Sequence, residues 1–174
     1  MAYLVLAYPE LVDSDLNDIQ RYRELHDELY FKVVDPHFTL VFPVFDIAEE
    51  TFIKEVKNIT KGQVKFNFYL RCATISKDAF NDSYHTFLVP DEGYSHFVRL
   101  HDRLYSGAFM DNLRLDINYI PHVAIGNSND KSLCKKMVDE WNEKDFAIRG
   151  SISALTIIRY EAGIVTNLVE IELA

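Results

Sequence analysis

The chain has 174 residues, of which 48% are hydrophobic and 13% aromatic, enough for one domain with a substantial core. Its formal net charge is −9, which argues against non-specific binding to duplex DNA or RNA, whose phosphate backbone requires a basic face. No run approaches the roughly 20 consecutive apolar residues of a membrane helix, so we expect no membrane partner.

Hydrophobic periodicity alternates along the chain between the two-residue repeat of strands and the three-to-four-residue repeat of helices. The strands predicted from this pattern cover residues 3–8, 36–45, 64–71, 84–89, 121–126, 152–160 and 165–173. The first predicted helix follows an N-cap at Ser14 or Asp15. The second covers residues 46–59, the third includes Phe97, and the fourth covers residues 130–141. The sequence Glu161-Ala162-Gly163 is typical of the turn in a β-hairpin.

Strands outnumber helices in this order, and a hairpin is present. The order therefore favours an α+β protein with mostly antiparallel sheets over a doubly wound parallel sheet. No Pro/Gly/Ser-rich linker or charge block divides the sequence, so we expect residues 1–174 to form a single domain.

Two short segments of the chain are similar to each other, and each carries a histidine. The first is Pro36-His37-Phe38-Thr39-Leu40-Val41 and the second is Pro121-His122-Val123-Ala124-Ile125-Gly126. The histidines lie 85 positions apart, close to half the chain, which suggests an internal duplication. We therefore expect two pseudo-symmetric lobes of sheet with helices packed outside and a groove between the lobes.

The strand pattern places the polar residues of both segments on one face. Because side chains alternate along a strand, His37 and Thr39 point the same way while their apolar neighbours anchor the strand. His122 and Ala124 share a face in the same manner. If the lobes are related by a pseudo-twofold axis, the two histidines meet across the groove.

Two histidines that flank a phosphodiester can catalyse its cleavage without a metal. One accepts a proton from the nucleophile and the other protonates the leaving oxygen, and an unperturbed pKa of about 6.5 suits histidine to both roles. A hydroxyl two residues from each histidine would donate a hydrogen bond to a non-bridging phosphate oxygen.

The two segments resemble the H-x-[ST]-x motifs of the 2H phosphoesterases, which include RNA 2′,5′-ligase-like proteins and 2′,3′-cyclic phosphodiesterases. His37-Phe38-Thr39-Leu40 matches the motif fully, and His122-Val123-Ala124-Ile125 matches except at its third position. The resemblance implies a metal-independent hydrolase of a 2′,3′-cyclic phosphate on a nucleotide, an RNA end or a related small ester. It makes His37 and His122 the acid/base pair and Thr39 a phosphate ligand, and it implies no cofactor and no metal.

Ala124 departs from the motif because it has no hydroxyl for the phosphate. By analogy with the loss of one oxyanion donor, this absence could lower the rate by about 10²–10³. Asn127, Ser128 and Arg159 are candidates to replace the missing donor. Arg159 lies on a predicted strand, where it would either face the groove as a substrate-binding residue or be an exposed arginine on an edge strand.

Other functions stay open at this point. Ligation of RNA ends through a 2′,5′ bond is the same chemistry with a hydroxyl in place of water, although the net charge of −9 disfavours a long polyanion. A binding module would hold a phosphorylated ligand or RNA end, with catalysis lost through Ala124. A third interpretation is that the motifs are coincidental, which predicts that His37 and His122 lie far apart.

The remaining histidines and cysteines carry less information. His26 fits a packed position on the first helix, and His85 lies on a strand whose face the pattern does not fix. The sequence start lacks a basic leader, and two cysteines do not make a disulfide framework. We expect a monomer in the reducing cytoplasm.

Overall fold

The computed structural model describes residues 1–79 and 81–174. Its strands are β1 (Ala2–Ala7), β2 (Glu10–Leu11), β3 (Phe38–Val44), β4 (Phe66–Lys77), β5 (Tyr84–Glu92), β6 (Val123–Ser128), β7 (Ile148–Ile152), β8 (Ala154–Glu161) and β9 (Ile164–Glu172). Its helices are α1 (Asp13–His26), α2 (Glu49–Ile59), α3 (Tyr94–Leu104) and α4 (Lys131–Asn142), with a 3₁₀ helix, η1, over Gly107–Asn112.

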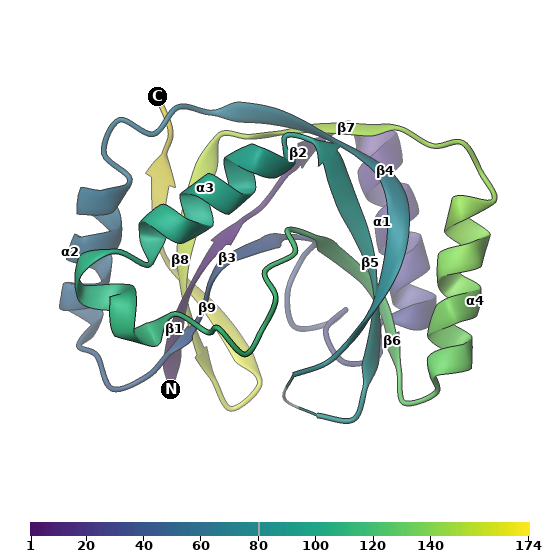
Figure 1. Ribbon diagram of the computed structural model, residues 1–174, viewed down its shortest axis with the longest axis horizontal. Coiled ribbons are helices and arrows are strands. Elements are labelled where there is room, and N and C mark those ends of the chain that lie inside the picture. Colours follow the sequence, from purple (N-terminus) through teal and green to yellow (C-terminus); the bar gives the residue numbers. More distant parts are fainter. Residues whose placement is uncertain (80) are drawn as a thin grey trace.

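The strands form two antiparallel sheets. The first has the order β3-β1-β8-β9 and the second has the order β2-β7-β4-β5-β6. Helices α2 and α3 lie beside the first sheet, and α1 and α4 pack on the outer side of the second (Figure 1). This architecture confirms the expected α+β fold with helices outside. None of the helices among the described residues is long and apolar enough to cross a membrane.

Several element boundaries differ from those that the periodicity predicts. The first helix begins at Asp13, with Val12 as its N-cap, so the predicted cap at Ser14 or Asp15 is wrong. The predicted strand 152–160 corresponds to β8 and begins too early, because Ile152 is the last residue of β7 in the second sheet and β8 enters the first sheet at Ala154. Asp130, predicted as the first residue of the last helix, is instead the N-cap of α4, since its carboxylate accepts a hydrogen bond from the Ser132 amide at 2.8 Å.

Strand β4 continues six residues beyond the Arg71 at which its predicted alternation ends. Register shifts on either side of Leu70 interrupt its pairing with β5, as a β-bulge does. The bulge changes which residues face the core, so a strict two-residue pattern fails there although the strand goes on. At the other end of the chain, Ala162 and Gly163 both have positive φ, which confirms the predicted hairpin between β8 and β9.

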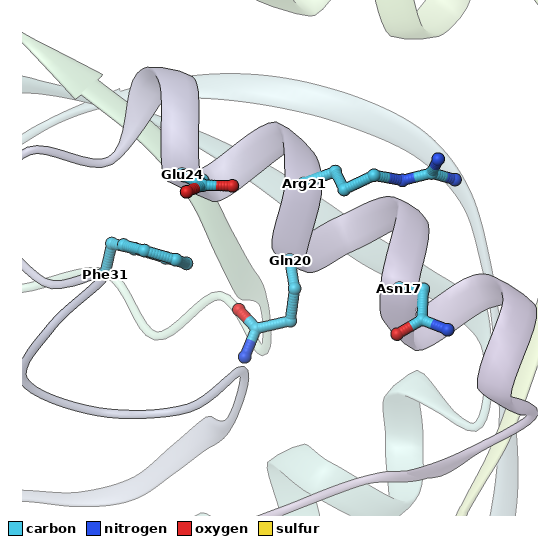
Figure 2. A pocket seen from close by; sticks show the side chains of 5 residues that line it. All are labelled: Asn17, Gln20, Arg21, Glu24 and Phe31. Carbon is cyan, nitrogen blue, oxygen red and sulfur yellow. The ribbon is translucent and has the colours of Figure 1, made fainter.

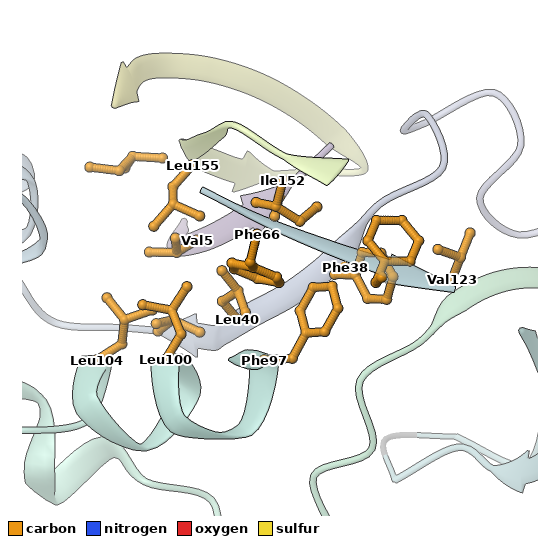
Figure 3. Packing of buried hydrophobic residues seen from close by; sticks show 14 of the residues in the cluster. Val5, Phe38, Leu40, Phe66, Phe97, Leu100, Leu104, Val123, Ile152 and Leu155 are labelled. Atoms are coloured by element: carbon orange, nitrogen blue, oxygen red, sulfur yellow. The ribbon is translucent and has the colours of Figure 1, made fainter. Parts of the chain in front are cut away.

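The hydrophobic core joins the two sheets through aromatic side chains. The ring of Phe38 stacks on Phe97 of α3 at 4.1 Å and meets the edge of Phe68 of β4 at 5.1 Å between centroids. Figure 3 shows Phe38 and Val123, the residues that follow the two motif histidines, in the same region of this core. Each is fully buried, and burial of such a side chain stabilises the fold by about 1.5–3 kcal/mol.

A tight turn at Gly93 connects β5 to α3. Its φ is +84°, and a Cβ built at this position would lie 2.6 Å from the Asn67 carbonyl oxygen. Glycine is therefore required both by the backbone conformation and by the close approach of β4.

Candidate active site

The two motif histidines occupy equivalent places in the two sheets. His37 directly precedes β3 and His122 directly precedes β6, and each of these strands is at the edge of its sheet. A proline precedes each histidine. Each histidine thus lies at the end of a loop that leads into an edge strand.

Burial along both strands follows the alternation that the sequence predicts. Phe38 and Leu40 are completely buried, whereas Thr39 between them is only partly buried. In β6, Val123 and Ile125 are completely buried while Ala124 is partly exposed. The apolar residues anchor each strand in the core, so the polar face of each motif remains accessible.

Each histidine is held by a hydrogen bond to the backbone two residues before it. The Nδ1 atom of His37 lies 2.8 Å from the carbonyl oxygen of Asp35, and that of His122 lies 2.6 Å from the carbonyl oxygen of Ile120. Because a carbonyl only accepts hydrogen bonds, Nδ1 carries the proton in both rings. Nε2 is therefore the nitrogen left to accept or donate a proton.

Neighbouring aromatic rings fix the orientation of both imidazoles. Phe87 of β5 stacks on His122 with ring centroids 3.5 Å apart and an interplanar angle of 16°. Tyr8, just after β1, presents an edge to His37 at 6.2 Å. Packing of this kind limits ring rotation, which a general acid or base needs in order to hold its proton in line.

Burial lowers the pKa of both motif histidines. The pKa of His122 falls to about 4, first because desolvation disfavours the charged ring and further because positive charge on His37 and His85 repels it. Burial likewise lowers the pKa of His37. Both histidines are therefore neutral and able to accept a proton near pH 7.

Thr39 offers a hydroxyl on the face of His37. Its Oγ1 makes no hydrogen bond to any described residue, whereas its backbone oxygen accepts one from the Tyr119 hydroxyl at 3.3 Å. On the other strand Ala124 pairs with Phe87 and contributes only a methyl group. The pair of motifs therefore supplies one hydroxyl donor instead of two.

The three candidates for the missing donor all have other partners. The Asn127 side-chain amide donates to Asp27, and the Ser128 hydroxyl accepts from the Asp130 amide at 3.0 Å. Arg159 lies 3.4 Å from a carboxylate oxygen of Glu49 in α2.

Arg159 also lies on the far side of the first sheet from Thr39. It pairs with Tyr3, whereas Thr39 pairs with Leu6, and these two residues of β1 point to opposite faces. Strand β8 lies between β1 and β9, so the alternative of an edge-strand arginine is wrong as well. The structure does not bring Arg159 to the histidines.

Two buried polar groups near the site were not predicted from the sequence. His85 of β5 lies with Nε2 2.6 Å from a carboxylate oxygen of Asp78, and its ring is stacked on Phe87 at 5.7 Å. Arg23 and Asp27 form an ion pair at 2.9 Å with both side chains almost fully buried. The sequence does contain a sign of this ion pair. Four-residue steps separate Ile19, Arg23 and Asp27, which places the charge pair in line with the apolar stripe of α1.

Two surface hollows lie away from the histidines. One, of about 350 Å³, is on α1 next to the loop that follows it. Figure 2 shows the side chains that line it: Asn17, Gln20, Arg21, Glu24 and Phe31. The other, of about 430 Å³, is formed by α4 and Ile75. Across residues 1–79 and 81–174, no three His, Cys, Asp or Glu side chains gather as metal ligands would.

A profile of the 2′-5′ RNA ligase superfamily matches residues 11–164 of the sequence. The chain belongs to this superfamily. The match confirms the resemblance to 2H phosphoesterases that the two histidine motifs carry. No curated protein sequence matches the chain.

Several solved structures share the fold at low sequence identity. E. coli LigT complexed with 3′-AMP has a TM-score of 0.64 at 15% identity, covering 99% of this chain and 97% of that one. TT0787 of Thermus thermophilus gives 0.62 at 13% identity, covering 99% and 98%. Usb1 of Kluyveromyces marxianus gives 0.56 at 10% identity, covering 96% and 97%. These likenesses confirm the fold over nearly the whole chain.

Proposed function

We propose that this chain is a metal-independent phosphodiesterase that hydrolyses a 2′,3′-cyclic phosphate on a nucleotide, an RNA end or a related small ester. The observation that carries the proposal is the matched pair His37 and His122. Each ring is anchored at Nδ1 to a backbone carbonyl and leaves Nε2 for the substrate. The charge of His37 contributes to the lowered pKa of His122, which supports a shared groove.

In the proposed reaction a water molecule attacks phosphorus in line with one ribose oxygen. One histidine takes a proton from the water through its neutral Nε2. The other takes up a proton when the anionic phosphate binds beside it, and gives that proton to the leaving oxygen. The bond between phosphorus and that oxygen breaks, which yields a phosphomonoester and a free hydroxyl. Each such proton transfer contributes about 10²–10⁴ in rate. Which histidine acts as base depends on which ribose oxygen leaves.

Thr39 is proposed to hold the phosphate, since its hydroxyl is free of other described partners. A donor that stays in place while charge builds up on a non-bridging oxygen stabilises the transition state. Ligand type is supported by the structural neighbours, because LigT structures contain 3′-AMP, NADP⁺, ATP or phosphate. Ala124 and Arg159 are proposed to make no polar contact with the phosphate.

A second candidate function is a binding module that holds a phosphate ester without turning it over. The observation that favours it is the absence of a hydroxyl at Ala124 together with the other partners of Asn127, Ser128 and Arg159. On this hypothesis the groove binds the ester through Thr39 and the histidines, and the rate of hydrolysis is negligible.

We propose that the chain is a monomer. We also propose one domain over residues 1–174, since a hydrophobic cluster of the described residues draws on both sheets. Cys72 and Cys134 are both free thiols, which suits the cytoplasm. A formal charge of −9 leaves a small ester or RNA end as the partner instead of duplex DNA.

The test is hydrolysis of a panel of 2′,3′-cyclic nucleotides and cyclic-phosphate-ended oligonucleotides in the presence of EDTA. Wild type is compared with His37→Ala and His122→Ala, and with His96→Ala as a control at an exposed position on α3. We expect each motif variant to lower kcat by about 10²–10⁴ and the control to leave it within twofold. Wild type that binds a cyclic nucleotide without hydrolysing it would establish the binding module instead.

A further inference from the structure

The loop between α1 and β3 determines where His37 lies. It folds back on the end of α1 through turn hydrogen bonds, from the Phe31 amide to the Asp27 carbonyl and from the Val34 amide to the Tyr30 carbonyl, both at 3.1 Å. Hydrogen bonds within a loop do not fix its position relative to the rest of the fold, so contacts from side chains outside the loop are needed. The fixing contacts come from Arg23 and Asp27.

Arg23 of α1 holds the loop through hydrogen bonds to its backbone carbonyls. Its guanidinium is only 2% exposed and donates from Nη2 to the carbonyls of Val34 at 2.8 Å and Tyr30 at 3.2 Å, while Nε donates to Asp27 at 2.9 Å. A planar guanidinium with several fixed donors orients all its partners at once. The loop is therefore held in one position relative to α1.

A second arm of the same network reaches the residue that anchors His37. Arg23 donates from Nη1 to the Gln20 side-chain oxygen at 3.2 Å, and Gln20 donates to the Asp35 carboxylate at 3.0 Å. Gln20 projects from α1 beside the hollow that Phe31 borders from the loop (Figure 2). The backbone oxygen of Asp35 is the acceptor for Nδ1 of His37.

Asp27 connects this loop to the strand of the other histidine. One carboxylate oxygen bonds to Arg23, and the other accepts from the Tyr30 amide at 3.1 Å and from the side-chain amide of Asn127. Asn127 lies in β6, five residues after His122. A continuous chain of hydrogen bonds therefore runs from the strand of His122 to the anchor of His37.

The energetics of this cluster favour a positioning role. Desolvation of each buried ion is unfavourable, and proteins with well-packed apolar residues at such a place are often as stable or more so. A buried ion pair is thus weak evidence for stability, whereas its directional bonds define one geometry. The charges of Arg23 and Asp27 also act on the pKa of His37, the first lowering it and the second raising it.

We propose that Arg23, Asp27 and Asn127 are positioning residues that set His37 against His122 across the groove. They act through the loop and its anchor at Asp35 and do not touch the substrate. The inference deepens the proposed phosphodiesterase and rests on it for its kinetic readout, although the geometry it describes is also measurable without turnover.

The test compares Asn127→Ala with Asn142→Ala. Asn142 is a matched control because its side chain also ties a helix to a strand, with two hydrogen bonds to the backbone of Ala73 at 2.7 and 2.9 Å, but on α4 and β4. We measure kcat and KM with the best cyclic nucleotide of the panel, and the ¹⁵N-detected imidazole signals of His37, which report its tautomer. Misplacing a catalytic group by about 1 Å lowers the rate by roughly 10².

We expect Asn127→Ala to lower kcat by about 10–100-fold with KM within threefold, and to mix the tautomers of His37. Asn142→Ala should leave both readouts as in wild type. Unchanged kcat and His37 signals in folded Asn127→Ala, or equal changes in the two variants, would overturn the proposal.

Two outcomes separate this proposal from the proposed function. If wild type hydrolyses nothing in the panel, the phosphodiesterase is refuted, and the His37 signals alone still decide whether Asn127 positions the ring. If Asn127→Ala does not fold, Gln20→Ala replaces it, because it cuts the arm to Asp35 at the surface. A His37 spectrum unaffected by Gln20→Ala would then count against the network.

Discussion

Protonation of His122 should destabilise the fold, and this effect can be isolated by substitution. His122→Asn removes the titrating ring, while the asparagine amide can still donate to the Ile120 carbonyl that Nδ1 of the histidine contacts. The pKa of His122 is lowered by its burial from 6.5 to about 4 in the native state. Between these values the unfolded chain takes up a proton that the native chain does not.

The magnitude follows from this difference in pKa. Each pKa unit corresponds to about 1.4 kcal/mol, so lowering it from 6.5 to about 4 makes the free energy of unfolding fall by about 3 kcal/mol between pH 7 and pH 4. The contribution is fully present above pH 6.5 and is lost as the pH falls through about 4. Since small domains are stable by only about 5–15 kcal/mol, the loss is readily measured.

Urea unfolding followed by the fluorescence of Trp141, the one tryptophan of the chain, gives the free energy at each pH. Carboxylates titrate over the same range in wild type and in the variant, so the difference between the two reports on His122 alone. We expect wild type to lose about 3 kcal/mol more than His122→Asn from pH 7 to pH 4. Asn142→Ala removes no titrating group and should differ from wild type by a constant amount. A difference between wild type and His122→Asn that does not change with pH would show that the ring is hydrated and would refute the reasoning.

Further substitutions test the site and the fold. Ala124→Thr should raise kcat by about 10²–10³ by restoring a donor to the phosphate, whereas Ala124→Val, of the same shape without the hydroxyl, should not; a rise in both variants would exclude the hydroxyl as the cause. Arg159→Gln should keep kcat within twofold. It should change the free energy of unfolding by less than about 1 kcal/mol, because the ion pair with Glu49 is at the surface. A large fall in kcat would indicate that Arg159 contacts the substrate. Gly93→Ala should lower stability in urea unfolding by more than about 1 kcal/mol, since φ is +84° and the Asn67 carbonyl leaves no space for a Cβ; equal stability would show that β4 can move aside.

The fold class and the two motifs could be predicted because both depend on local pattern. Alternation along β3 and β6 determines which residues are buried, and it needs no knowledge of the partner strands. Arg159 shows where local pattern fails, since its face depends on which strand pairs with β8 and on where α2 packs. Arg23 and Asn127 show the same limit, because a polar side chain gives no sign in sequence of the loop or strand it will bind.

The two sheets are interleaved along the chain, although the motifs repeat at about half its length. The first sheet takes its strands from residues 2–44 and 154–172, and the second takes its own from residues 10–11 and 66–152. No single point in the sequence divides the chain into the two sheets. Strand β1 lies between β3 and β8, so it pairs with strands from both ends of the chain. We therefore expect slow folding governed by contacts between distant residues, with the proposed groove forming only after β8 has joined the sheet.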